Sequence, residues 1–146
     1  MSDLLIEFSY AAGTMPPPHH YSYTLNIDIN GRGLIEYIPD YDFDGVPVWS
    51  YSFVLADESL AAVKNGVETI LKITDRIKRV EKRTVGGSLK SAVIYSEQGV
   101  IKIQSDIESN PVVDEFYSSI KGAIPDEINE RIKADRENYI KERYNK

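Results

Sequence analysis

With 146 residues and a net charge of −6, the chain is long enough for one domain with its own core. Its acidic balance argues against nucleic acid as the main partner, because phosphate binding needs a basic surface, and the absence of cysteine excludes disulfides and thiolate sites. We therefore predict a single soluble domain over residues 1–146, whose charge suits a basic protein partner.

The N-terminal segment predicts a cytoplasmic protein whose first element is a strand. Met1-Ser2-Asp3 lacks the basic and apolar regions of a signal peptide, and no later run is apolar for long enough to span a bilayer. Large apolar residues then alternate from Leu4 to Tyr10, which predicts a strand. Pro16 to Pro18 predict an extended connection outside the sheet.

The stretch from Tyr21 to Leu55 predicts three neighbouring strands of one sheet. Tyr21 to Asp28 alternates large apolar with small polar residues, as a half-buried strand does. Gly33 to Ile38 predicts the next strand, and Trp49 to Leu55 predicts the third, with aromatic residues that suit a pleated surface. We expect the aromatic face that these strands share to be mostly core.

The turn between the first two of these strands determines their register. Asn30-Gly31 between alternating runs is a strong hairpin signal. A two-residue turn would place Leu25 opposite Glu36. A three-residue loop from Ile29 to Gly31 gives the pairs Leu25–Ile35, Tyr23–Tyr37 and Asp28–Arg32. We favour the second register, because it makes one face consistently apolar and pairs opposite charges across the strands.

A helix and a second hairpin follow. Asp57 predicts a helix N-cap, and apolar residues at helical spacing continue the helix from Glu58 to Ile73. The segment from Thr74 to Thr84 fits a helix, an edge strand or a loop. Leu89 to Tyr95 and Val100 to Gln104 then predict a hairpin.

The C-terminal part predicts two more helices. Pro111 suits the first position of a helix that Gly122 ends, and Pro125 begins another whose later turns are mostly charged. Hairpins in place of regular strand–helix–strand units indicate an α+β fold. We therefore predict a mostly antiparallel sheet of about six strands, including two hairpins, with two to three helices packed on one face.

The clearest candidate for a metal site is the run Asp40-Tyr41-Asp42-Phe43-Asp44-Gly45. Carboxylates at its first, third and fifth positions, with glycine at the sixth, match the start of a calcium-binding loop. The match then ends, because the twelfth position is Tyr51 instead of glutamate and the flanking segments are predicted strands. We predict Asp40, Asp42 and Asp44 as metal ligands, with an acidic turn as the alternative interpretation.

Three other stretches have the residue types of binding or catalytic sites. His19-His20 could supply a general base acting with an aspartate, although adjacent histidines on an extended chain point to opposite sides. Thr84 to Ser88 contains a glycine pair that fits either an anion-binding nest or a turn. The basic stretch from Lys72 to Arg83 is interpreted as a solvated face.

The sequence as a whole favours a protein that binds another protein without catalysis, as a bacterial immunity or antitoxin protein does by analogy. It contains no catalytic motif, and its many tyrosines combine contact area with a hydrogen bond, as interfaces require. The predicted partner-binding residues are Tyr41, Phe43, Tyr139 and Tyr144. Self-association stays open. One alternative is a small-ligand or calcium-binding domain that uses Asp40–Asp44, and another is an enzyme with a His–Asp pair.

Overall fold

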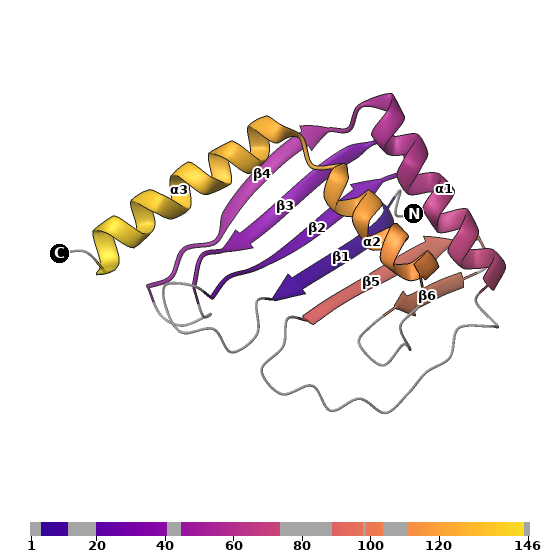
Figure 1. Ribbon diagram of the computed structural model, residues 1–146, viewed down its shortest axis with the longest axis horizontal. Coiled ribbons are helices and arrows are strands. Elements are labelled where there is room, and N and C mark those ends of the chain that lie inside the picture. The colour runs from indigo at the N-terminus through magenta and orange to yellow at the C-terminus, as the bar shows by residue number, and fades with distance from the viewer. Residues whose placement is uncertain are drawn as a thin grey trace.

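A computed structural model describes residues 4–11, 20–40, 45–73, 89–97, 99–103 and 111–144, except the side chains of Leu89 and Tyr144. Its strands form one antiparallel sheet: β1 (Leu4–Ala11), β2 (Ser22–Asp28), β3 (Arg32–Ile38), β4 (Trp49–Val54), β5 (Leu89–Ser96) and β6 (Gly99–Ile103). The helices α1 (Asp57–Ile73), α2 (Pro111–Gly122) and α3 (Asp126–Tyr144) lie on one face of this sheet (Figure 1). The predicted α+β fold is confirmed.

The strand order is β4-β3-β2-β1-β5-β6, so the two predicted hairpins meet at β1. β2, β3 and β4 are added one after another on one side of β1, and β5 with β6 pairs on its other side. The predicted elements are present with ends that shift by about one residue, which is the usual uncertainty of such boundaries. The stretches Thr74 to Thr84 and Thr84 to Ser88 lie outside the described residues.

The β2–β3 turn confirms the three-residue loop. Leu25 pairs with Ile35 and Tyr23 pairs with Tyr37, as the apolar pattern predicts. Gly31 has a φ of 87°, in the left-handed region that favours glycine. The Asp28 carboxylate accepts hydrogen bonds from the backbone N–H groups of Asn30 and Arg32, both at 2.9 Å, and so holds the loop closed.

The core lies between the sheet and the helices α1 and α2. Buried residues at helical spacing, such as Val63 and Ile70 on α1 and Phe116 on α2, cover the apolar face of the strands. Gly66 allows α2 to approach closely, since a Cβ there would lie 2.9 Å from Cδ1 of Phe116. No helix in the described ranges is long and apolar enough to cross a membrane.

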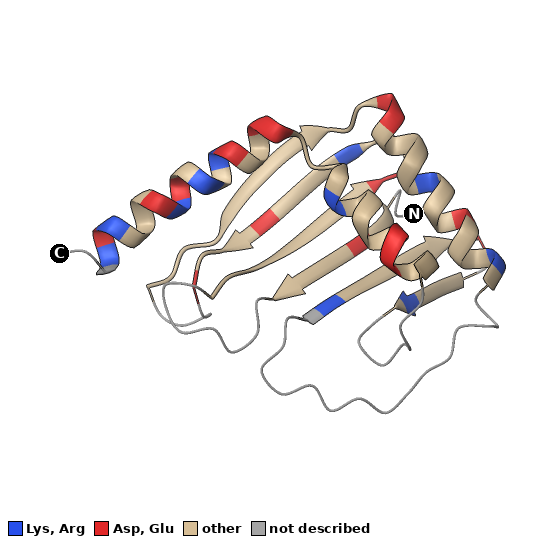
Figure 2. Cartoon of the chain, viewed as in Figure 1, with Lys and Arg blue, Asp and Glu red and all other residues tan. Residues whose placement is uncertain are grey.

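The third helix differs from the other two. Both signs of charge alternate along α3, and Ile128 is its one fully buried apolar side chain among the described residues of the helix (Figure 2). α3 runs along the β4 side of the sheet, while α1 begins near the end of β4 and runs toward β6 (Figure 1). The sheet residues beside α3 are therefore covered by a helix that has few apolar side chains to fill the space.

Candidate functional site

A row of stacked aromatic rings crosses the sheet on its helix-covered face. Strand register places Tyr10 opposite Tyr23, Tyr23 opposite Tyr37 and Tyr37 opposite Trp49, on four neighbouring strands. The successive ring centroids are 5.5, 6.3 and 5.9 Å apart, with interplanar angles of 27°, 9° and 3°. We call these four residues, together with Tyr21, the aromatic row. The ring of Tyr21 stacks against that of Tyr37, and its centroid lies 5.6 Å from the ring centroids of both Tyr37 and Tyr10.

The aromatic row is only partly core. Tyr37 is 4% exposed, which confirms the predicted burial, whereas Tyr10, Tyr21, Tyr23 and Trp49 are half-buried. Burial raises the pKa of Tyr23 and of Tyr37 well above the usual range of tyrosine. The pKa of Tyr21 is also raised, first by burial and then by a hydrogen bond with Tyr10. These phenols therefore stay protonated and keep their hydrogen-bond donors at neutral pH.

Two tyrosine hydroxyls connect α3 to the rest of the domain. The Tyr51 hydroxyl donates a hydrogen bond of 2.6 Å to Oδ2 of Asp135. The Tyr139 hydroxyl donates one of 3.1 Å to Oδ2 of Asp40, which is fully buried. The ring of Tyr139 also meets Trp49 edge to face, with centroids 6.0 Å apart. These contacts hold α3 beside the aromatic row.

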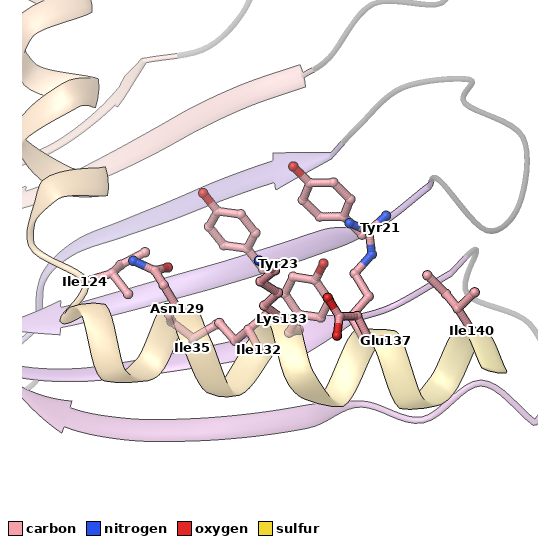
Figure 3. Close-up of a pocket in the computed structure, with 11 residues that line it drawn as sticks. Tyr21, Tyr23, Ile35, Ile124, Asn129, Ile132, Lys133, Glu137 and Ile140 are labelled. Atoms are coloured by element: carbon pink, nitrogen blue, oxygen red, sulfur yellow. The ribbon is translucent and has the colours of Figure 1, made fainter. Parts of the chain in front are cut away.

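A cleft of about 450 Å³, which we call the α3 cleft, lies between this helix and the sheet. Its sheet side consists of Tyr21, Tyr23, Tyr37 and Ile35. The helix side and the segment before it contribute Ile124, Asn129, Ile132, Lys133, Arg136, Glu137 and Ile140. Figure 3 shows Tyr21 and Tyr23 rising from the sheet beside the helical residues. Apolar side chains, phenols and charged groups thus share one cavity.

Cations from three elements lie around the aromatic row. The guanidinium of Arg136 on α3 is 4.7 Å from the ring centroid of Tyr21, and Nζ of Lys121 on α2 is 4.9 Å from that of Tyr10. Burial lowers the pKa of Lys121, and so does the nearby Lys90 of β5. The tyrosine hydroxyls therefore lie in a positive environment within an acidic protein.

The predicted calcium loop lies largely outside the described residues. Asp40 is described, and its carboxylate binds the Tyr139 hydroxyl, whereas residues 41–44 are not described. In the described ranges no group of three His, Asp or Glu side chains is arranged to hold a metal ion. A calcium site that uses Asp40, Asp42 and Asp44 stays a prediction.

The other predicted site residues are spread over the chain. Tyr139 is half-buried and helps to attach α3. His20 is half-buried and does not line the α3 cleft. His19, Tyr41, Phe43 and the side chain of Tyr144 lie outside the described part. Partner binding by Tyr41, Phe43, Tyr139 and Tyr144 stays a prediction.

The sequence does not predict the α3 cleft, although it does predict part of the sheet side of that cleft. The alternation in residues 21–28 and 33–38 predicts that Tyr23 and Tyr37 are cross-strand neighbours, as they are. Nothing in the local pattern of α3 predicts which strands Arg136 and Ile132 face. No protein-family model matches the chain, and no curated protein sequence matches it. The fold and the cleft define an α+β domain with a partly open aromatic site.

Proposed function

We propose that the protein is a non-catalytic interaction module that binds a segment of another protein in the α3 cleft. The observation that carries this proposal is the set of three stacked tyrosines on the sheet side of the cleft, two of which are only half-buried. Tyrosine offers a large rigid contact area and a hydroxyl at low conformational cost, and aromatic residues dominate binding energy at interfaces.

The chemistry of the cleft fits a peptide segment with an apolar side chain. Ile35, Ile132 and Ile140 can pack against such a side chain, and the tyrosine rings give a flat surface for it. The phenols of Tyr21 and Tyr23 can donate hydrogen bonds to backbone carbonyl groups of the same segment. A volume of about 450 Å³ is of the order needed for a few side chains.

The titratable groups of the cleft favour binding over acid–base chemistry. Glu137 is the carboxylate among its described lining residues, and it is exposed beside Arg136 and Lys133. The raised pKa values of Tyr23 and Tyr37 make these phenols hydrogen-bond donors at neutral pH and poor bases. The cleft therefore supplies groups that orient a bound segment.

The proposal is tested by site-specific photocrosslinking in cells that express the protein. A photoreactive amino acid replaces Lys133, which is exposed and lines the cleft, or Lys64, which is exposed on α1. We expect one crosslinked protein from position 133 and none from position 64. A second change then fills the cleft: Asn129→Trp adds a large ring at an exposed lining position, and Asn138→Trp makes the same change outside it.

Asn129→Trp should abolish the crosslink from position 133, and Asn138→Trp should leave it intact. A crosslink that survives Asn129→Trp, or one that forms equally from positions 133 and 64, would contradict binding in the cleft. A crosslink to a second copy of this chain would replace the proposed partner with self-association. Absence of any crosslinked protein, together with an Asn129-dependent small molecule in the purified protein, would identify a small-ligand site instead.

A further inference from the structure

Two tyrosine hydroxyls form a polar centre between the helices α2 and α3. Tyr10 of β1 and Tyr21, which directly precedes β2, are joined by a side-chain hydrogen bond, and their rings lie 5.6 Å apart. Lys121 lies over the ring of Tyr10 at 4.9 Å, and Arg136 lies over the ring of Tyr21 at 4.7 Å. One cation from each helix thus approaches the same pair of phenols.

A third cation lies on the sheet itself. Lys90 pairs with Tyr10 in the β1–β5 register, so its side chain lies on the same face as that ring, and its Nζ is 5.9 Å from the ring centroid of Tyr117. Burial and the charge of Lys90 both lower the pKa of Lys121, so the two ammonium groups lie close enough to repel each other.

This arrangement is unfavourable for the protein alone. Partial desolvation and a neighbouring like charge both disfavour the protonated form of Lys121, although its side chain is exposed, and groups perturbed in this way are concentrated at functional sites. In the α3 cleft, Glu137 is the nearby carboxylate on the side of Arg136. An anion bound beside the phenols would relieve the repulsion between the lysines.

We propose that Lys90, Lys121 and Arg136 bind a phosphate group beside the hydroxyls of Tyr10 and Tyr21. Phosphate carries about −1.5 to −2 charges at neutral pH and has several acceptor oxygens. It therefore suits three cations and the one phenol O–H that the Tyr10–Tyr21 hydrogen bond leaves free better than a single carboxylate does. Arginine provides bidentate contacts and lysine provides point charges, as phosphate sites commonly combine. This inference does not depend on a protein segment occupying the α3 cleft.

The source of the phosphate follows from the position of the site. Tyr21 and Arg136 also line the α3 cleft, so an organic group attached to the phosphate can extend into that cleft. Inorganic phosphate and phenyl phosphate are therefore the two probes. Tighter binding of phenyl phosphate, weakened by Asn129→Trp, would identify a phosphate ester as the ligand. Equal binding that Asn129→Trp does not change would identify free phosphate.

The test titrates both probes into the full chain at constant ionic strength, with the melting temperature and phosphorus NMR as readouts. Saturable binding is expected for the unmodified protein. Lys121→Gln and Arg136→Gln should each weaken binding about tenfold or more, because each removes a charge-assisted contact. Lys64→Gln, which changes an exposed lysine on α1, should bind phosphate normally.

Tyr10→Phe serves as the variant that keeps the ring and removes one donor. It should fold normally and bind phosphate several-fold more weakly, because one neutral hydrogen bond is lost. Failure of both probes to bind the unmodified protein would overturn the proposal. Equal binding by the Lys121→Gln and Lys64→Gln variants would also overturn it. Neither result would bear on crosslinking from position 133, so this proposal and the protein-binding proposal can fail separately.

Discussion

The hydroxyl of Tyr139 is expected to stabilise α3 against the sheet, and Tyr139→Phe tests this directly. The hydroxyl donates to Asp40 at 3.1 Å, and the aspartate is 0% exposed. The phenylalanine ring can keep the edge-to-face contact with Trp49, so the substitution isolates the hydrogen bond. Ile128 is the one fully buried apolar side chain among the described residues of α3, so a hydrogen bond to the buried Asp40 should contribute measurably to the attachment of the helix.

The magnitude follows from the burial of the acceptor. Depriving a buried acceptor of a partner costs about 1–3 kcal/mol. Asp40 has other interactions, so we expect the lower part of this range, about 1–2 kcal/mol. Local opening of the second half of α3 should then become about 5–30 times more frequent. Hydrogen exchange of residues 135–143 should accelerate by this factor.

The assay combines urea unfolding with hydrogen exchange, and Tyr95→Phe is the matched control. The Tyr95 hydroxyl contacts Glu7 at 3.5 Å on strands β5 and β1, away from α3. Its removal should change the free energy of unfolding by less than about 0.5 kcal/mol and leave exchange in α3 unaltered. If Tyr139→Phe behaves like Tyr95→Phe, the contact with Asp40 does not hold α3, and the reasoning is refuted.

Three further predictions follow from other parts of the molecule. Gly66→Ala should lower stability by about 1 kcal/mol in a thermal melt although alanine favours helices, because its Cβ would lie 2.9 Å from the buried Phe116 ring; a stabilised variant would contradict this packing. The raised pKa values of Tyr23 and Tyr37 favour the neutral phenols in the folded state. The two tyrosines therefore contribute fully to the free energy of unfolding below about pH 10. Above that pH the contribution of each tyrosine falls by up to about 1.4 kcal/mol per pH unit. Urea unfolding between neutral and alkaline pH should show this decline, with a shallower slope for Tyr37→Phe. If the Asp40–Asp44 loop binds calcium, millimolar calcium should raise the melting temperature of the protein and not that of Asp42→Asn; an unchanged melt of the unmodified protein would remove the calcium interpretation.

Local patterns were sufficient to predict the strands and the register of β2 with β3. The period-two alternation and the Asn30-Gly31 turn together define one register that keeps apolar residues on a single face, and Tyr23 accordingly lies opposite Tyr37. The start of α1 and both ends of α2 were also predictable, because Asp57 and Pro111 favour a helix start and Gly122 favours a helix end through local backbone chemistry.

The position of α3 could not be predicted in the same way. Its low amphipathicity gives no clear face to bury, and the contacts that attach it join residues 84 and 99 positions apart. The contacts of Tyr51 with Asp135 and of Tyr139 with Asp40 are tertiary. The local sequence likewise gives no reason for Gly66 in the middle of α1, because the reason is the close approach of Phe116 from α2.

The candidate site depends both on local sequence patterns and on tertiary contacts. Sequence alternation predicts that tyrosines share a face of the sheet, but whether that face is closed or partly open depends on the placement of α3. The cations show this as well, because Lys90, Lys121 and Arg136 come from three separate elements. No short motif contains them, so their arrangement emerges only from the packing of the helices on the sheet.

The most direct test of the central claim is the affinity of the purified, crosslink-identified protein partner for the Asn129→Trp and Asn138→Trp variants, measured by calorimetry. If the partner inserts a segment into the α3 cleft, Asn129→Trp should weaken binding at least about a hundredfold, as expected when about 3 kcal/mol of interface contacts is blocked. Asn138→Trp should bind like the unmodified chain, because that position does not line the cleft. Equal affinities for the two tryptophan variants would contradict the cleft as the binding site.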